Sequence, residues 1–274
     1  MSYQIDPNKP SEKFLDARNI AGVSLQNQFK AEGGKIAEPL DYRWIKADLT
    51  WPSFDHLTFA YGNQVFSVLV NITDEKGSSL TQMEISRCVE ACKANDLVPC
   101  VFDIDYKSLR PKMLGWNLRH LCTGESLIPS NIITRGKILM SEWELTNFSI
   151  QIVRNHLSED NGKSILSYCD VLGIDPQIWF ENGSGERNWI IVRHYPVIKG
   201  DEKNEWVGFE RSNPQLQEYD GYLAVVSMAS SEPVLYDLDG NLIPLSERFN
   251  GKAPLYRGDG FYIKFDGLQR IFVS

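Results

Sequence analysis

The sequence predicts an α/β fold in which helices flank a mixed β-sheet. Three observations carry this prediction. Capping-box spacings precede two amphipathic stretches, a nearly continuous apolar run has the pattern of a strand covered on both faces, and turn dipeptides separate runs rich in Val, Ile, Phe and Tyr. A hairpin, a helix and a buried strand in this order are typical of mixed α/β architecture.

The first part of the chain predicts a helix followed by a β-hairpin. Residues 10–30 carry apolar side chains at mixed three- and four-residue spacings, and Ser11 stands where a helix cap is expected. Residues 57–72 are rich in Val, Phe and Tyr around Gly62-Asn63, which is a turn signal. We therefore expect two antiparallel strands that meet at this dipeptide.

A second helix and a buried strand follow the hairpin. Ser79 and Gln82 have capping-box spacing, and apolar residues that share one face continue a helical pattern over 79–96. The run 98–105 is nearly continuous in apolar residues, as in a strand that is covered on both faces of its sheet.

The second half of the chain again begins with a helix and continues with strands. Residues 141–160 predict an amphipathic helix, because Ser141 and Glu144 fit a capping box ahead of an apolar stripe. The elements expected after it are a short strand, a hairpin with a Gly-rich turn, a polar loop and a strand, at 163–171, 173–196, 199–219 and 221–230.

The C-terminal part of the sequence predicts further β structure. Residues 235–245 are expected to form a hairpin that turns at Asp239-Gly240. The alternation over 260–273 predicts another hairpin, which turns at Asp266-Gly267. The end of the chain is therefore expected to be ordered and rich in strands.

The two halves of the chain resemble each other in their hairpins. Residues 54–59 align with 174–179, and residues 68–71 align with 190–193, so each hairpin reads acid, strand, turn, strand and polar end. Two explanations remain open, a duplicated module and two unrelated hairpins of a common pattern. The predicted domains are an N-terminal α/β module at 1–125 and a C-terminal α/β module with terminal β-hairpins at 137–274.

Composition and charge narrow the classes of function. No window approaches the roughly 18 apolar residues that a membrane span requires, and the first residues lack a signal-peptide pattern. The five scattered cysteines are typical of reduced thiols, so we expect a cytoplasmic protein with no disulfide framework and no membrane partner. The net charge of −8 disfavours a nucleic-acid partner, and the basic stretch at 106–120 is interpreted as a solvated helix face with Trp116 buried.

The hairpin at 173–196 carries the residues that suggest a specific chemistry. Asp175 stands at the entrance of its first strand. Trp189, Ile191 and Arg193 share one face of the returning strand, because side chains alternate with a period of two.

This arrangement resembles the PD-(D/E)XK nuclease superfamily over residues 141–230. In that family a helix leads into a meander whose central strands carry an acid, then an acid and a lysine two residues apart. The resemblance implies a restriction-endonuclease-like module, or two tandem modules with a β-rich C-terminal extension. It also implies carboxylates that hold a divalent metal, usually magnesium, which polarises a phosphate and activates water.

The position-by-position match leaves the motif incomplete. Asp175 matches the first acid, Ile191 occupies the place of the second acid, and Arg193 occupies that of the lysine. An isoleucine side chain cannot ligate a metal, and arginine lacks the compact ammonium group of lysine. In the first half of the chain, Asp55 keeps the acid, while Leu69 and Asn71 stand at the other two positions.

A metal site would need acids from other parts of the chain. Glu144 matches the helix acid of some family members, although its capping-box position explains it without catalysis. If the protein is a nuclease, Asp175 and Glu181 are expected to hold Mg or Mn, with Arg193 and Glu144 in the catalytic set. The further candidates for a displaced acid are Glu186 and Asp170.

The leading hypothesis is a non-catalytic interaction protein on a degenerate nuclease-like scaffold, without a cofactor. The missing acid and the acidic net charge favour a protein partner, including a basic one. The alternative is a divergent Mg- or Mn-dependent nuclease acting on DNA or RNA. A third hypothesis is that the β-rich tail forms a separate sheet with an exposed aromatic binding surface, with Phe261, Tyr262 and Phe272 as candidates.

Overall fold

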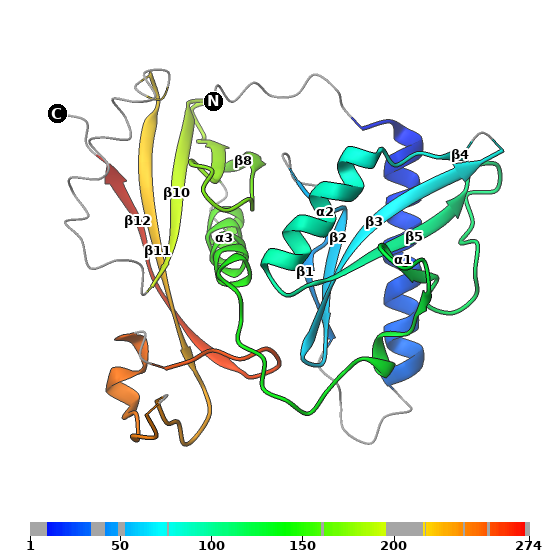
Figure 1. Cartoon of the computed structure of the whole chain (residues 1–274). Coiled ribbons are helices and arrows are strands. Elements are labelled where there is room, and N and C mark those ends of the chain that lie inside the picture. Colours follow the sequence, from blue (N-terminus) through cyan, green and yellow to red (C-terminus); the bar gives the residue numbers. More distant parts are fainter. Residues whose placement is uncertain are drawn as a thin grey trace. The chain divides into compact units, whose positions relative to one another are not determined.

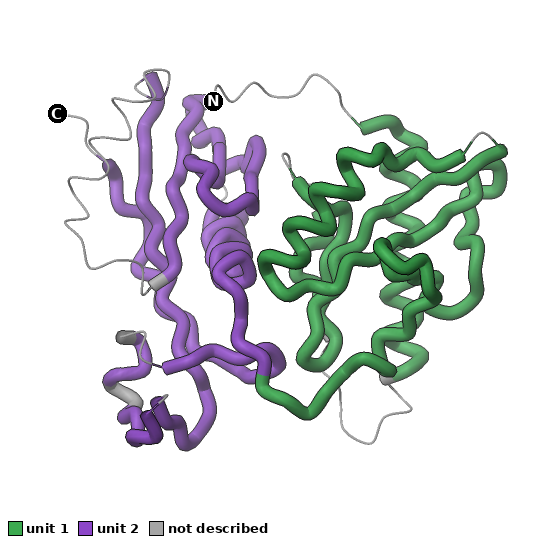
Figure 2. The backbone as a smooth tube through the Cα atoms, in the orientation of Figure 1, with its two compact units in different colours: residues 1–137 green, residues 138–274 purple. Residues whose placement is uncertain are grey.

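The chain divides into two units, Met1–Lys137 and Ile138–Ser274, each with its own core (Figure 2). We call them unit 1 and unit 2. The computed structural model describes residues 10–33, 42–48, 53–75, 77–159, 162–195, 216, 218–237, 239–250 and 253–271.

Unit 1 is built on a seven-stranded mixed sheet in the order β1-β2-β3-β5-β6-β7, with the short β4 paired to β3 (Figure 1). Strands β3 and β5 are parallel, and the other neighbours are antiparallel. Its elements are α1 (Glu12–Gly33), β1 (Tyr42–Lys46), β2 (Leu57–Tyr61), β3 (Gln64–Asp74), β4 (Gly77–Ser78), α2 (Gln82–Ala94), β5 (Val98–Asp105), β6 (Leu118–His120), β7 (Ser126–Leu127) and the short helix η1 (Pro129–Asn131).

Local sequence signals explain where these elements begin and turn. Ser11 Oγ accepts a hydrogen bond from the backbone of Phe14 at 3.2 Å and caps α1, as predicted. Gly62 adopts a φ of 57° in the turn between β2 and β3, which confirms the hairpin. The prediction that Ser79 and Gln82 cap α2 is wrong, because the capping box is formed by Thr81 and Glu84, two residues later.

Helices α1 and α2 cover opposite faces of the unit 1 sheet (Figure 1). Leu25 and Phe29 of α1 pack with Phe66 and Val68 of β3 in one cluster of buried side chains. Side chains alternate along a strand, so Ser67 points to the other face, where its hydroxyl contacts Cys88 of α2. Strands β3 and β5 are therefore covered on both sides, as the apolar run at 98–105 predicts.

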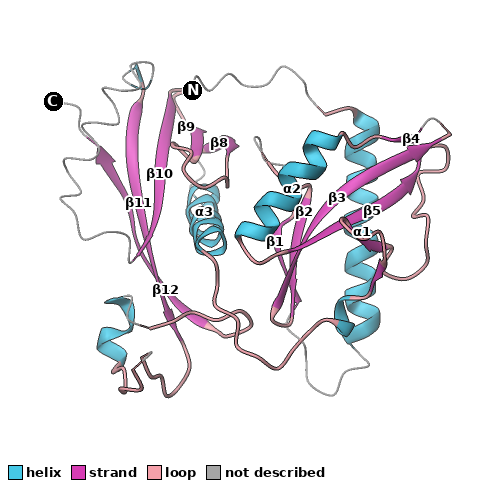
Figure 3. Ribbon diagram, in the orientation of Figure 1, coloured by secondary structure: helices cyan, strands magenta, loops and turns pink. Residues whose placement is uncertain are grey.

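Unit 2 is built on a five-stranded mixed sheet in the order β12-β11-β10-β9-β8 (Figure 3). Strands β10 and β11 are parallel, and the remaining neighbours are antiparallel. Its elements are α3 (Glu142–Glu159), β8 (Ser164–Tyr168), β9 (Ile178–Glu181), β10 (Arg187–Tyr195), β11 (Asp220–Ser230), the short helix η3 (Leu245–Asn250) and β12 (Phe261–Ile271).

Helix α3 packs on one face of the unit 2 sheet. Its buried residues Ile150, Val153 and Leu157 join a cluster with apolar side chains of β9, β10 and β11. Ser141 and Glu144 form the predicted reciprocal hydrogen bonds at its start, with distances of 2.9 and 3.2 Å. The predicted amphipathic helix is thus confirmed.

The C-terminal predictions are confirmed in one part and wrong in another. Residues 235–243 turn at Gly240, with antiparallel contacts that include an isolated bridge between Tyr236 and Leu242. Residues 261–271 form one strand of the main sheet and no hairpin. Gly267 has a φ of 91° beside a register shift against β11, so the glycine marks a bulge inside β12.

Two other predictions are affected by the structure. The stretch at 106–120 is not a helix face, because it holds turns and β6, although Trp116 is buried as expected. The predicted polar loop at 199–219 and the candidate Phe272 lie mostly or wholly outside the described residues.

The two units share the order of their main strands, although unit 1 also has β4 and α2 between β3 and β5. In each, a helix is followed by a three-stranded antiparallel meander, then by a strand parallel to the third, then by an antiparallel strand. The mixed α/β fold class is therefore confirmed in both sheets. Within the described residues, no helix has the length and apolar content to cross a membrane.

Candidate functional site

The structure brings Asp175 and Arg193 together at one end of the meander in unit 2. Ile178 of β9 pairs with Ile190 of the antiparallel strand β10. Asp175 lies three residues before Ile178, and Arg193 lies three residues after Ile190, so both are at the same end of the pair. The guanidinium donates from Nη1 to Oδ1 at 2.9 Å and from Nη2 to Oδ2 at 2.5 Å. This two-point contact uses both carboxylate oxygens. The side chain of Asp175 is 17% exposed and that of Arg193 is 27% exposed.

Gln177 supports this ion pair, and sequence reasoning did not find it. Its Nε2 donates to Asp175 Oδ1 and to the carbonyl of Ile174 at 2.8 Å. Its Oε1 accepts a hydrogen bond from the backbone of Val192 at 2.8 Å. The buried amide thus fixes the loop that carries Asp175 to the strand that carries Arg193.

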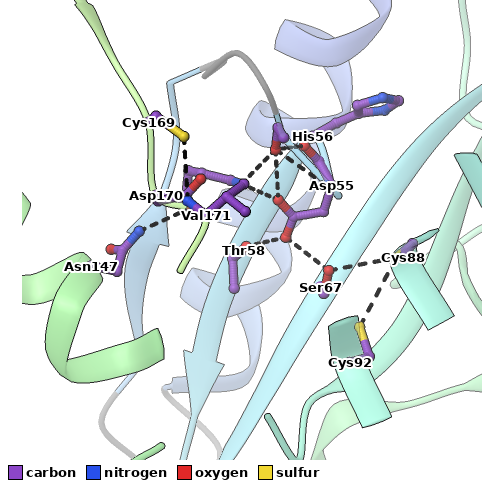
Figure 4. A network of polar contacts seen from close by, with 12 residues as sticks. Asp55, His56, Thr58, Ser67, Cys88, Cys92, Asn147, Cys169, Asp170 and Val171 are labelled. Carbon is purple, nitrogen blue, oxygen red and sulfur yellow. Dashed lines mark hydrogen bonds and ion pairs between the residues drawn. The ribbon is translucent and has the colours of Figure 1, made fainter. Parts of the chain in front are cut away.

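The other predicted acids lie elsewhere or have other partners. Glu181 is the last residue of β9, and Asp175 lies three residues before its first residue. The strand alone spans about 10 Å at roughly 3.3 Å per residue, so the two acids are far apart. Glu144 is fully buried and binds Arg257, with Nη2–Oε2 at 2.8 Å. Asp170 is buried and accepts a hydrogen bond from Asn147 Nδ2 of α3 at 3.2 Å (Figure 4).

Glu186 is in the turn after β9. Hydrogen bonds from the side chains of Asn182 and Ser184 hold the pKa of its exposed carboxyl below the ordinary value. The carboxylate of Glu186 is therefore held by side chains of its own turn. Like Glu181, it lies at the end of β9 that is far from Asp175.

A magnesium ion does not fit the residues at Asp175. Ile191, in the place of the second acid, is completely buried in a cluster with Trp189 and Leu223. The carboxylate of Asp175 already faces a cation that stays protonated in proteins. Among the described residues, no three His, Cys, Asp or Glu side chains are arranged to hold a metal.

Unit 1 also holds its equivalent acid with a cation, but from a different strand. Asp55, before β2, forms an ion pair with Lys46 at the end of β1, and both side chains are buried. The carboxylate also accepts hydrogen bonds from the hydroxyls of Thr58 and Ser67 (Figure 4). Nothing in the sequence pattern pointed to Lys46, because the strand that carries it was not predicted.

In unit 1, the residue at the position of the second acid packs in the core, and the residue at the position of the lysine belongs to a second polar cluster. Leu69 is buried. Asn71 Nδ2 donates to Asp103 Oδ1 on the neighbouring strand β5 at 2.8 Å. Asp103 also accepts from Arg119 Nε of β6 at 2.8 Å, so this cluster is a separate one from that of Asp55.

His56 lies beside Asp55 and remains neutral at physiological pH. Its Nδ1 accepts a hydrogen bond from the backbone of Val70 at 2.9 Å, and its ring contacts Phe14 edge-on. Burial, as the largest cause, lowers the pKa of His56 to about 4 from its ordinary 6.5. A neutral imidazole that accepts a backbone hydrogen bond is a structural group here.

This lowered pKa predicts a loss of stability in mild acid. The unfolded chain binds a proton near pH 6.5 and the folded chain near pH 4, so stability is present above 6.5 and is lost as the pH falls between these values. From pH 7 to 4.5 this one group should lower the free energy of unfolding by about 2 kcal/mol. Urea denaturation at both pH values should show a smaller loss for His56→Asn, and equal losses would contradict this role.

The comparisons with known proteins concern unit 2. The model of a family described as "Domain of unknown function (DUF8840)" matches residues 143–271, which run from α3 to β12. Neither the curated proteins nor the solved structures that were compared with the chain gave a match.

Proposed function

We propose that this is a non-catalytic interaction protein, which binds a protein partner on a scaffold of two degenerate nuclease-like units. The observation that carries the proposal is the internal pairing of both acids at the strand entrances. Asp55 is held by Lys46 and Asp175 by Arg193, each within its own unit.

The order of elements supports a nuclease-like origin of the two units. Each begins with a helix that leads into a meander, and in each an acid precedes the second strand of that meander. The different sources of the cation, β1 in unit 1 and β10 in unit 2, support two copies of one module that lost the catalytic set separately.

The ion pairs themselves disfavour a metal-dependent reaction. A divalent ion would have to displace the guanidinium from both oxygens of Asp175, and the second position offers the buried side chain of Ile191. In unit 1 the ion pair and two hydroxyl donors occupy Asp55 in the same way. Ion pairs of this kind stabilise each unit and occupy the carboxylates that a metal would need. They do not interfere with the binding of a protein partner on the surface.

The charge of the chain defines the class of partner. A net charge of −8 attracts basic surfaces and raises their association rate at low salt. A basic protein is therefore the partner that this scaffold fits best.

A calorimetric titration of manganese tests the loss of the metal site. We expect no saturable binding to the wild-type chain and the same trace for Asp175→Ala, because Arg193 occupies the carboxylate. Asp16→Ala, at an exposed aspartate of α1, is the control for nonspecific binding to surface carboxylates. Saturable binding that is lost in Asp175→Ala and kept in Asp16→Ala, together with cleavage of DNA or RNA, would establish the nuclease alternative.

The partner itself is tested by co-purification of the full chain from its native cells. We expect a basic protein that binds the purified chain saturably and whose affinity falls as salt is raised. Recovery of no such protein would contradict the interaction role.

A further inference from the structure

A hairpin in unit 2 spans 234–244, of which the structure describes 234–237 and 239–244. Its strands are joined by backbone hydrogen bonds from Ile243 to Leu235 at 2.8 Å and from Asp237 to Asn241 at 2.9 Å. Tyr236 and Leu242 form an antiparallel bridge and are therefore side by side on one face. Residues of this segment lie between β11 and β12 in the chain.

The two faces of the 234–244 hairpin differ in burial. Leu235 and Ile243 point inward and are 5% and 4% exposed, in a small cluster with Ala253. The outer face carries the large apolar side chains Val234, Tyr236 and Leu242, which are 57%, 55% and 63% exposed. The burial pattern therefore presents an apolar surface of three neighbouring side chains to solvent, which single exposed residues do not.

The base and the tip of the hairpin are both fixed by polar contacts. The buried guanidinium of Arg248 donates to the carbonyls of Ser230, Glu232 and Pro233, with 3.1 and 3.2 Å for the first and the last. At the tip, Asp237 Oδ1 accepts from the backbones of Asp239 and Asn241 at 2.9 and 2.8 Å. A partner that binds here meets a surface whose conformational entropy has already been reduced.

The tip of the hairpin carries two aspartates. Asp237 follows Leu235 by two residues in its strand and so lies on the inner side, opposite Tyr236 and Leu242. Hydrogen bonds from Asn241 hold the pKa of Asp237 below its ordinary value, so the carboxylate is ionised. Asp239 is exposed at the same turn. Within the described part of the chain, neither aspartate forms an ion pair, and Asp239 is the more exposed of the two.

We propose that the outer face of the 234–244 hairpin docks a protein segment that presents a large apolar side chain next to lysine or arginine. The apolar residue packs on Tyr236 and Leu242, and the cation pairs with the exposed carboxylate of Asp239 at the tip. Aromatic side chains contribute strongly to such contacts, because they bury a large area with few rotatable bonds. This assignment rests on the proposed interaction role and names the surface and the partner chemistry for it.

Selection from a random twelve-residue peptide library displayed on phage tests the assignment with the full chain as bait. The library is first depleted on Tyr236→Ser/Leu242→Ser, whose changes lie on exposed positions and should leave the fold intact. We expect enriched peptides that combine a large apolar residue with neighbouring Lys or Arg. Their affinity should fall at least about tenfold in the double variant and about threefold in Asp239→Asn.

Matched controls separate the hairpin from general stickiness and general charge. Val23→Ser/Met83→Ser removes two apolar side chains of similar exposure from the helices of unit 1. Asp16→Asn removes one exposed carboxylate from α1. Neither control should change the affinity of the selected peptides.

Two results would overturn the docking surface. One is the absence of any peptide that distinguishes wild type from Tyr236→Ser/Leu242→Ser, and the other is an enriched sequence without basic residues. If a co-purified basic protein binds this double variant as tightly as wild type, the surface is wrong while the interaction role stands. If no partner is recovered at all, the interaction role fails instead.

Discussion

Replacement of Arg257 by alanine is expected to lower the free energy of unfolding of unit 2 by about 3–5 kcal/mol. Glu144 and Arg257 have side chains only 1% exposed, and Nε and Nη2 contact the carboxylate at 3.0 and 2.8 Å. The variant leaves a buried carboxylate without its cation, and this unpaired charge explains the size of the loss. Chemical denaturation followed by tryptophan fluorescence measures it, with Trp143 adjacent to Glu144 in α3.

Arg270→Ala is the matched control for this variant. Arg270 pairs with Asp220 in the same unit, but the two side chains are 50% and 46% exposed, so solvent screens the pair and the loss should be much smaller than in Arg257→Ala. Equal losses in the two variants would contradict the structural role of the buried pair. Arg257→Lys keeps the charge and provides a folded reference if the alanine variant does not fold.

Replacement of Lys46 by methionine is expected to destabilise unit 1 by a similar amount, about 3–5 kcal/mol. Methionine fills most of the volume of lysine, so the change removes mainly the charge opposite Asp55. The side chains of the pair are 2% and 0% exposed, and the remaining ligands of Asp55 are neutral hydroxyls. Thermal and urea unfolding of the full chain should show a separate, earlier transition for unit 1.

Lys264→Met tests whether this effect comes from burial. Lys264 is 61% exposed and lies 3.4 Å from Asp266, so its replacement should change stability by less than about 1 kcal/mol. If Lys46→Met also lowers the free energy of unfolding by less than about 1 kcal/mol, the buried pair contributes little to stability. Asp55 would then be a candidate for a functional role.

Local signals in the sequence predicted most of the elements, because the interactions that define them are close in the chain. The cap of α1 at Ser11 and that of α3 at Ser141 involve contacts over three residues. The sequence predicts the capping box of α2 two residues too early, since both spacings occur there and the structure selects Thr81. It predicts a turn at Gly267 because it does not reveal that β11 continues past this glycine as a pairing partner.

The candidate site was less predictable, because its contacts join distant parts of the chain. The motif match places Asp175 and Arg193 at one site, but the sequence does not show that the two side chains form an ion pair. The contact from Arg257 to Glu144 spans 113 residues and has no local signature. Lys46 belongs to a five-residue strand that the hydrophobic pattern did not indicate, so the partner of Asp55 was missed.

The start of unit 2 is tied to its late segment, and this has a practical consequence for work with fragments. The backbone of Met140 donates to Leu255 and that of Arg257 to Ile138, both within 2.9 Å, and Leu139 bridges Tyr256. The family match begins later, at residue 143, and so omits residues 138–140 and the cap Ser141. An expression fragment of unit 2 therefore has to begin at or before residue 138, because a fragment cut at the bounds of the match would lack both the cap of α3 and the strand-like pairing that closes the unit.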